Sequence, residues 1–577
     1  MTAEHDPKDS HEKCLTNRKR SLVKFGLVAI ASTIWFTLRT GTRPSRVAYP
    51  CQQAALANMQ IFKTAILASI PSIASIRSRT SLMKPALILI LISAGSFFIA
   101  SETFPAFFEP LQSESDDYTR VPNNMTSQSA SAPEAVSALF YVKNATGLEG
   151  NLDEAIDALF NLMSSQGLHF YQTAGTPEGL IGSNDVIIIK MNGQWESRGG
   201  TNTDLIKSVI NAIIDHPDGF TGEVVIADNG QGIGDLNRDL ANGYLHNQSA
   251  QKVADSFASS WNVSTILWDD LRESTVDDYD EGDFADGYVR SSVWHDDTQI
   301  FVSYPKFRSP ATGAYVSFKK GIWSNVTGFD TDRLKVINMP VLKSHELLGV
   351  TASVKHYMGV PQGHIVPSVD DEVPHEHFAV ALGGMGTMIA ETRAPVLNIL
   401  DMIWVNAHPL EVSILRGPWS TYRSARFTDI IGASLDPVAL DYWSAKYVLL
   451  PTAEYLDYQT YSSLDPDYEP VSQHIYYPYV QQEESFHNYL ERSMNELRDS
   501  GFQVTMNESE MDVFTIELPD RPIIPIIPST STATGTTTTT TSTTEDPDWL
   551  ELLPMLMLPI SAGIIVLVAV ILKQRST

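Results

Sequence analysis

The run LKVINMPVLKSHELLGVTASVKHYMGV, residues 334–360, decides the interpretation of this chain, because apolar segments in it lead directly to basic side chains. An apolar run that begins at Val336 ends in Lys343 and His345. Ten residues after His345, Lys355 and His356 follow a second apolar patch. Ammonium and imidazole groups are costly to place beside so much hydrophobic sequence unless an anion or a metal accompanies them. The stretch therefore predicts a site without naming a reaction.

Outward from this stretch, short Val/Ile-rich runs alternate with helix-like segments, a pattern typical of a mainly parallel sheet buried on both faces. We expect an α/β fold with helices on both faces of the sheet, a small C-terminal α+β cap and terminal transmembrane helices. The predicted strands are residues 186–189, 224–227, 264–267, 300–303, 336–337, 397–400 and 430–433, and the predicted helices are 151–163, 204–215, 250–260, 437–446 and 484–498. Two further strand-like runs, 502–506 and 513–518, belong to the cap.

The N-terminal part of the chain differs in composition from the rest. Residues 1–84 are basic and are expected to be membrane-associated or a start-site extension, and residues 85–104 resemble a signal anchor or transmembrane segment. Residues 105–150 are predicted to be a linker, 151–450 the α/β domain and 451–520 the cap. The chain carries 13 Lys and Arg against 4 Asp and Glu up to Ser101, a charge of +9, which leaves −37 for the remainder. This split separates a basic, membrane-proximal start from an acidic body.

The C-terminal part has the pattern of a membrane anchor on a stalk. Residues 521–550 are rich in Pro and Thr, residues 551–572 are predicted to be a transmembrane helix, and 573–577 form a basic tail. The basic residues around both predicted spans place the body on the extracytoplasmic side of the cell membrane and the tail in the cytoplasm. Six Asn-x-Ser/Thr sequons are compatible with an exported glycoprotein: Asn124, Asn144, Asn247, Asn262, Asn325 and Asn507.

Charge and cysteine content exclude several classes of protein. A net charge of −28 repels nucleic-acid phosphates and argues against a nucleic-acid partner. The two cysteines, Cys14 and Cys51, precede the predicted body, which therefore has neither a disulfide nor a thiolate-bound iron–sulfur cluster. The sequence leaves open whether a divalent metal is bound by residues other than cysteine. It identifies no protein partner.

Polar side chains follow five of the predicted strands, where ligands of open α/β sheets bind. Strands must also end in something polar, so each residue alone has an ordinary structural explanation; the set favours a site. The residues concerned are Lys190, Asn192, Asp228, Asn229, Asn338, Lys343, His345, Asp401, Ser434 and Asp436.

Three features of the sequence have structural alternatives. Residues 199–203 precede a predicted helix, and their free amides suit a carboxylate or phosphate, but Thr203 also suits a plain N-cap. Asp436 is a candidate ligand-binding residue and equally a cap for the helix that begins at Pro437. His375 and His377 are spaced for shared metal ligation, or are exposed loop histidines.

Five motifs in order resemble the domain of unknown function 362 family. They are VIIIKMNG at 186–193, GGTNTDLIKSVINAI at 199–213, VINMPVLKSHELLGVTASVKHYMGV at 336–360, LNILDMI at 397–403 and IIGASLDPVALDYWSAKYV at 430–448. The resemblance covers roughly 180–450 and implies motif positions at Lys190, Asn192, Lys343, His345, Lys355, Gly359, Asp401, Asp436, Pro437 and Asp441. Many relatives carry a ferredoxin-like module, which this chain lacks, and relatives usually show Lys-Asn where this chain has Lys355-His356.

A fainter likeness is to the nickel-pincer lactate racemases, in which a histidine precedes a lysine at about the spacing of His345 and Lys355. In those enzymes the lysine carries a covalent nickel cofactor. The likeness implies a metal-cofactor enzyme as one alternative.

We therefore expect a membrane-anchored domain that binds a small anionic or metal-chelating ligand. One form of this hypothesis is that the domain also acts on the ligand as an enzyme. The predicted catalytic residues are Lys343, His345, Lys355 and Asp401; the predicted ligand-binding residues are Lys190, Asn192, Thr201, Asp436 and Asp441; the predicted metal ligands are His345 and His356. The rival hypothesis is a non-enzymatic surface module for adhesion or envelope organisation on a glycosylated stalk. Convergence of Lys190, Lys343, His345 and Lys355 would favour the first.

Overall fold

The computed structural model describes residues 118–520, apart from 124, 133–134, 149, 233, 239, 346–347, 363–375, 409–424, 459–461 and 469–484. The predicted N-terminal region 1–84, both predicted transmembrane segments, the stalk and the tail lie outside these residues. Among the helices that the described residues form, none is both long and apolar enough to cross a bilayer.

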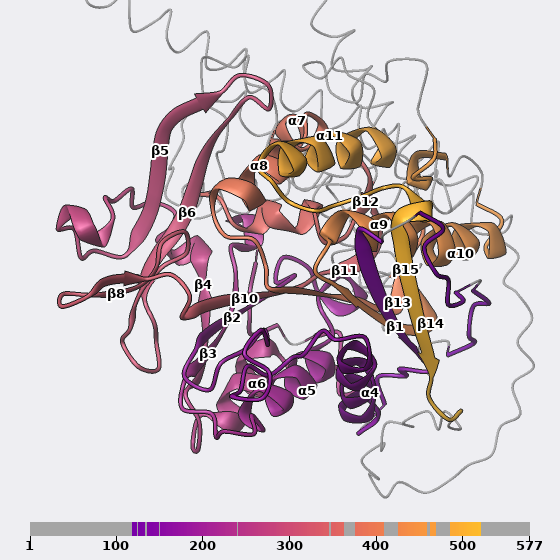
Figure 1. Ribbon diagram of the computed structural model, residues 1–577, viewed down its shortest axis with the longest axis horizontal. Helices are drawn as coiled ribbons and strands as arrows, with labels where there is room; N and C mark the ends of the chain where they lie inside the picture. The colour runs from indigo at the N-terminus through magenta and orange to yellow at the C-terminus, as the bar shows by residue number, and fades with distance from the viewer. Residues whose placement is uncertain are drawn as a thin grey trace, which may run out of the picture. The chain divides into compact units, whose positions relative to one another are not determined.

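A central sheet of ten strands organises the described residues (Figure 1). Eight strands lie in the order β15 (Met511–Glu517), β1 (Ser137–Lys143), β14 (Ala425–Ser434), β13 (Leu397–Asn406), β10 (Leu334–Met339), β2 (Val186–Met191), β3 (Glu223–Asp228) and β4 (Val263–Leu267). Strands β13, β10, β2, β3 and β4 are all parallel to one another. Strand β14 is antiparallel to both β13 and β1. The largely parallel sheet is as predicted.

Two short strands extend the centre of the sheet. After Pro340 the chain continues from β10 into β11 (Val341–His345), which pairs in parallel with β13. Strand β12 (Gly349–Thr351) turns back and pairs antiparallel with β11. The basic residues of the 334–360 stretch are therefore carried beyond the end of β10.

Alternation of apolar side chains along the strands builds one core on each face of the sheet. In β2, Ile187 and Ile189 pack into the core under α4 (Asn151–Ser165), α5 (Thr203–Ile214) and α6 (Ala250–Phe257). Val186 and Ile188 pack into the other core, with residues of α8 (Gly384–Glu391), α9 (Pro437–Ser444) and α11 (Phe486–Asp499). Figure 1 shows these two groups of helices on opposite sides of the sheet, as predicted.

The second group of helices comes from the C-terminal half of the described chain. It contains α7 (Glu376–Ala381), α8 (Gly384–Glu391), α9 (Pro437–Ser444), α10 (Leu450–Tyr455) and α11 (Phe486–Asp499).

A second sheet was not predicted. Residues 300–303 were expected in the main sheet but belong to an antiparallel sheet in the order β5 (Gly287–His295), β6 (Ile300–Arg308), β7 (Tyr315–Ser317), β8 (Gly321–Ser324) and β9 (Gly328–Asp330). The apolar run was a correct strand signal, but hydrophobicity does not specify which sheet a strand joins.

Both ends of the α/β domain also differ from the prediction. Residues 137–143 lie in the predicted linker but form β1, in which Phe140, Tyr141 and Val142 are buried. Residues 502–506 form no strand, and β15 pairs with β1 at the edge of the central sheet. The predicted cap therefore contributes a strand to the main sheet.

Candidate functional site

A buried ion pair joins the ends of β2 and β3. The Lys190 ammonium group donates to Asp228 Oδ1 at 2.9 Å, and both side chains are buried. Asp228 Oδ2 accepts a hydrogen bond from the backbone of Gly193 at 2.8 Å. Burial lowers the pKa of Lys190, whereas the Asp228 carboxylate raises it. Lys190, predicted from its wholly apolar strand, thus lies in a polar centre.

The short helix η7 (Lys355–Gly359) packs on this ion pair through glycine. A Cβ atom on Gly359 would lie 2.3 Å from Asp228 Oδ1 and 2.4 Å from Lys190 Nζ, so a side chain has no room there. Asn229, the residue after β3, donates its backbone N–H to the Gly359 carbonyl and its side-chain amide to the Pro361 carbonyl, at 3.2 and 2.8 Å. The end of β3 therefore fixes the helix that carries Lys355 and His356.

Lys343 and Lys355 add two more buried ammonium groups near the ion pair. Lys343 is 3 % and Lys355 6 % exposed, and Lys343 donates to the carbonyl of Gly199 at 2.7 Å. Burial lowers the pKa of Lys343 well below its usual value; the charge of Lys355 lowers it further, and that of Asp228 raises it. We call Lys190, Lys343 and Lys355, with His356 and Asp228, the lysine cluster.

His356 is the imidazole of this cluster. Burial lowers its pKa well below 6.5, and the charges of Lys190, Lys343 and Lys355 lower it further, while the backbone of Met191 opposes the shift. The ring is therefore neutral at pH 7.

A buried amide row fixes which nitrogen of His356 holds the proton. Asn338 Nδ2 donates to the Ser353 carbonyl at 3.1 Å and to Asn398 Oδ1 at 2.9 Å, so its Oδ1 must be the acceptor toward His356 Nδ1 at 2.7 Å. Asn398 in turn donates to the Ser434 carbonyl. Nδ1 of the neutral ring therefore carries the hydrogen, and the buried Nε2 is the nitrogen without a proton.

Asp441 positions the turn before Lys355. Its two carboxylate oxygens accept the backbone N–H groups of Ser353 and Val354 at 2.7 and 2.8 Å. Burial raises the pKa of Asp441 to about 7, against the lowering effect of these two hydrogen bonds. Asp441, predicted as a ligand-binding residue, thus contacts the backbone of the segment that delivers the cluster.

Asp401 faces the other side of the sheet. Its Oδ2 accepts the backbone N–H of Asn202 at 2.8 Å, and its Oδ1 accepts that of Ile403 at 3.1 Å. Burial raises the pKa of Asp401 to about 6. Asn202, rather than Thr203, caps α5, and a carboxylate of the chain itself occupies the loop in front of the helix. Asp401, which was predicted to be catalytic, thus binds the backbone of the loop before α5 and of its own strand.

Asn192 and Thr201 brace the same loop. Asn192 Oδ1 accepts the backbone N–H of Val341 at 3.0 Å, and its own backbone N–H donates to Thr201 Oγ1 at 2.8 Å. Thr201 Oγ1 donates to the Met339 carbonyl at 2.7 Å. Both predicted ligand-binding residues therefore tie the loop at Gly199, which accepts the Lys343 hydrogen bond, to the β10–β11 connection.

Asp436 does not belong to the rim of the lysine cluster. Because β14 is antiparallel to β13, its C-terminal end lies beside the beginning of β13, where Ser434 pairs with Asn398. Asp436 Oδ1 caps α9 through the N–H groups of Val438 and Ala439 at 2.8 and 3.0 Å. The capping alternative is therefore the one that the structure supports.

His345 has a different neighbour from the one predicted. Its Nε2 lies 3.2 Å from Nε2 of His377, which belongs to α7. His356, the other predicted metal ligand, is enclosed by ammonium charges that disfavour a cation. The pairing of His375 with His377 is outside the described residues, because 375 is not among them.

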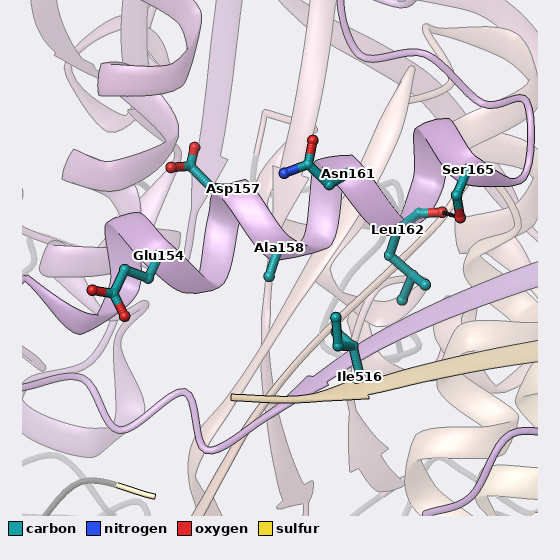
Figure 2. A pocket seen from close by; sticks show the side chains of 7 residues that line it. All are labelled: Glu154, Asp157, Ala158, Asn161, Leu162, Ser165 and Ile516. Atoms are coloured by element: carbon teal, nitrogen blue, oxygen red, sulfur yellow. Dashed lines mark hydrogen bonds between the residues drawn. The ribbon is translucent and has the colours of Figure 1, made fainter. Parts of the chain in front are cut away.

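A surface pocket lies away from all of these groups. It is formed by the outer face of α4 and by β15, as Figure 2 shows. Its lining residues are Glu154, Asp157, Ala158, Asn161, Leu162, Ser165 and Ile516. Its carboxylates make it a poor place for an anion, and no residue of the lysine cluster lines it.

The segment from β10 through α9, which carries Lys343, Lys355, His356 and Asp441, is the part of the chain that matches a family model. Residues 324–446 match DUF362, a domain of unknown function. The match is shorter than the predicted resemblance, which covers roughly 180–450. Lys190 and Asp228 lie before the matched residues. No curated protein matches the chain, and no solved structure does either.

Three residues around the DUF362 match were not among the predicted site residues. Asp228 and Asn338 were predicted only as polar strand ends, and His377 either as a metal ligand shared with His375 or as an exposed loop histidine. The signal for Asp228 was its position directly after the apolar strand 224–227, beside the strand that ends in Lys190. Which polar strand ends meet depends on strand order, which a single sequence does not reveal.

Proposed function

We propose that the DUF362 domain, together with β2 and β3, binds a small anion such as a carboxylate or phosphate at the lysine cluster. One observation carries this proposal: three lysine side chains, each 6 % exposed or less, lie near one another and all act on the pKa of His356. They come from the end of β2, from β11 and from η7, which are separate parts of the chain.

The need to balance the charges of buried lysines is the physical reason to expect an anionic ligand. Taking an ammonium group out of water costs several kcal/mol unless an opposite charge accompanies it. Asp228 makes a direct ion pair with Lys190, and its charge also acts on Lys343. An anion beside Lys343 and Lys355 would offset the mutual repulsion of their charges. A surface module without a ligand would have no such reason to bury the three lysines.

His356 gives the site a proton acceptor. Its ring is neutral, its Nδ1–H donates to Asn338, and its Nε2 carries a lone pair. It is the better proton carrier than His345, which faces His377 instead. Within the proposal, the lysines hold the anion and His356 Nε2 accepts a proton from it, which is general-base chemistry.

The other sequence-based expectations enter the proposal unchanged. The apolar run 551–572, with basic residues after it, supports anchoring in a membrane with the body on the extracytoplasmic side. The likeness to nickel-pincer lactate racemases stays a prediction, and no step here uses a nickel cofactor.

The test is calorimetric titration of the purified full-length chain with inorganic phosphate, lactate and malate. Lys343→Met and Lys355→Met keep much of the side-chain volume and remove the charge. We expect each to weaken binding at least tenfold, which corresponds to about 1.4 kcal/mol. Lys207→Met, on the exposed face of α5, is the matched control and should bind as the wild type does. Equal binding by all three variants would contradict the proposal.

A further inference from the structure

The two histidines His345 and His377 approach each other through the same ring atom. His345 is the last residue of β11 and His377 lies in α7, and their ring centroids are 4.9 Å apart with planes tilted by 39°. The two Nε2 atoms are 3.2 Å apart. Both rings are half-buried.

This separation fits two ligands of one metal ion. Two imidazole nitrogens bound to a tetrahedral metal at about 2.0–2.1 Å lie about 3.3 Å from each other. A hydrogen bond between neutral rings also fits the distance, so metal binding itself decides between the two explanations. We propose that His345 and His377 together bind a divalent transition metal such as Zn²⁺.

The part of the chain that the structure describes supplies two ligands to the proposed site, His345 and His377. Within the described ranges, no group of three or more His, Cys, Asp or Glu side chains is arranged to hold a metal. A tetrahedral ion on two histidines keeps two positions for water or for an exogenous ligand. A metal ion with positions left for exogenous ligands binds and polarises a ligand rather than stabilising the fold.

The strand geometry places this metal beside the lysine cluster. Residues 343–345 pair with β12 in regular register, so Lys343 and His345 lie on the same face of β11 while Ser344 points to the other. Two residues along a strand span about 7 Å. Ser344 is accordingly bonded elsewhere, to the carbonyl of His408 at 2.6 Å.

This neighbourhood defines the ligand class. Resting on the proposed function, we infer an anion with two donor groups, such as a 2-hydroxycarboxylate, one part of which binds the metal while its charge faces the lysines. Carboxylate and hydroxyl oxygens bind Zn²⁺ in open sites. Such a ligand would join His345 and His377 to Lys343 and Lys355.

Metal binding is tested first, without any anion. The full-length chain, freed of metal by a chelator and dialysed, is titrated with Co²⁺ as a spectroscopic substitute, and with Zn²⁺ by calorimetry. We expect a visible Co²⁺ band whose intensity saturates at one ion, and at least tenfold weaker binding in both His345→Gln and His377→Gln. His169→Gln, a half-buried histidine near the end of α4, is the control and keeps the band. Circular dichroism verifies that each variant is folded.

Persistence of the band in either single variant would overturn the shared site, as would its absence from the wild type. Lactate is then titrated into metal-free and Zn²⁺-loaded protein. Tighter binding to the loaded form supports the two-donor ligand, and equal binding refutes it. If phosphate binding still depends on Lys343 and Lys355 while Co²⁺ does not bind, the metal inference fails and the proposed function stands. If Co²⁺ binds as expected and no anion does, the proposed function fails instead.

Discussion

Gly359 lies against Lys190 so closely that a Cβ atom at position 359 would be 2.4 Å from the lysine Nζ. The helix that carries Lys355 and His356 can therefore approach the Lys190–Asp228 ion pair only because this residue has no side chain. A glycine in a short helix is in this case a requirement of the site and not of a turn.

Replacing Gly359 with alanine should disturb the ion pair and shift η7. We expect Gly359→Ala to lower the free energy of unfolding by about 1–3 kcal/mol, the usual range for overpacking, and to weaken phosphate binding. Chemical denaturation and calorimetry measure the two effects. Gly175→Ala is the control, because position 175 is exposed and the nearest atom to its Cβ would be 3.7 Å away. Wild-type stability and affinity in Gly359→Ala would show that the close approach does not matter.

Asp441 should give the stability of the domain a measurable pH dependence. Its pKa is raised from 3.8 to about 7 by burial, so the folded state holds a proton that the unfolded chain has already released. The stability that this proton contributes is present below pH 4 and is lost as the pH rises through 7. Asp441→Asn removes the titration, so its stability relative to the wild type should rise by roughly 2–4 kcal/mol between pH 4 and pH 7.

Urea unfolding of both proteins across this pH range makes the measurement. The variant also loses one acceptor for Ser353 or Val354, but that cost does not change with pH. Asp255→Asn, at an exposed carboxylate of α6, should give a constant difference from the wild type. A constant difference in Asp441→Asn as well would mean that Asp441 is ionised in the folded state.

Substitutions of His356 distinguish a structural role of its ring from a role in proton transfer. His356→Ala leaves the buried Asn338 Oδ1 without its donor, which costs about 1–3 kcal/mol of stability. His356→Asn restores an N–H donor and should recover part of that loss while retaining phosphate binding, because the lysines hold the anion. Thermal unfolding and calorimetry measure these quantities. Loss of phosphate binding in a folded His356→Asn protein would mean that the imidazole itself contacts the anion.

The structure separates the sequons that a glycosylated, exported chain can use. Asn144 is buried and donates its side-chain amide to the Leu518 carbonyl at 2.6 Å, so a glycan there is incompatible with the fold. The side chains of Asn247, Asn262, Asn325 and Asn507 are exposed. Glycopeptide mass spectrometry of the protein from its own host should find glycans at exposed sequons and none at Asn144. An occupied Asn144 in folded protein would contradict the position of β1.

The sequence predicted the strand segments well because each is a short apolar run, and it failed where strand direction and partner matter. Residues 430–433 form part of β14, but nothing in their composition indicates an antiparallel strand. Asp436 was consequently expected at the wrong edge. Residues 300–303 are as apolar as a central strand because one face of the second sheet packs into the same core, with Ile300 and Val302 both buried.

The candidate site was predicted as a set of basic residues but not as an arrangement. Lys190, Lys343 and Lys355 do share one buried region, as their apolar flanks suggested. The carboxylate that pairs with Lys190, Asp228, could not be chosen over the other strand-end acids, because the choice depends on β2 and β3 being neighbours. His345 and His377 are 32 positions apart, and only the packing of α7 brings them together.

The most direct measurement is a crystal structure of the chain soaked in selenate, whose selenium gives an anomalous signal that locates a tetrahedral anion. The account predicts an anomalous peak within hydrogen-bonding distance of Lys343 Nζ and Lys355 Nζ in the wild type, and none there in Lys343→Met. Selenate found only at exposed lysines such as Lys207, with protein groups filling the space around the lysine cluster, would contradict the proposed anion site.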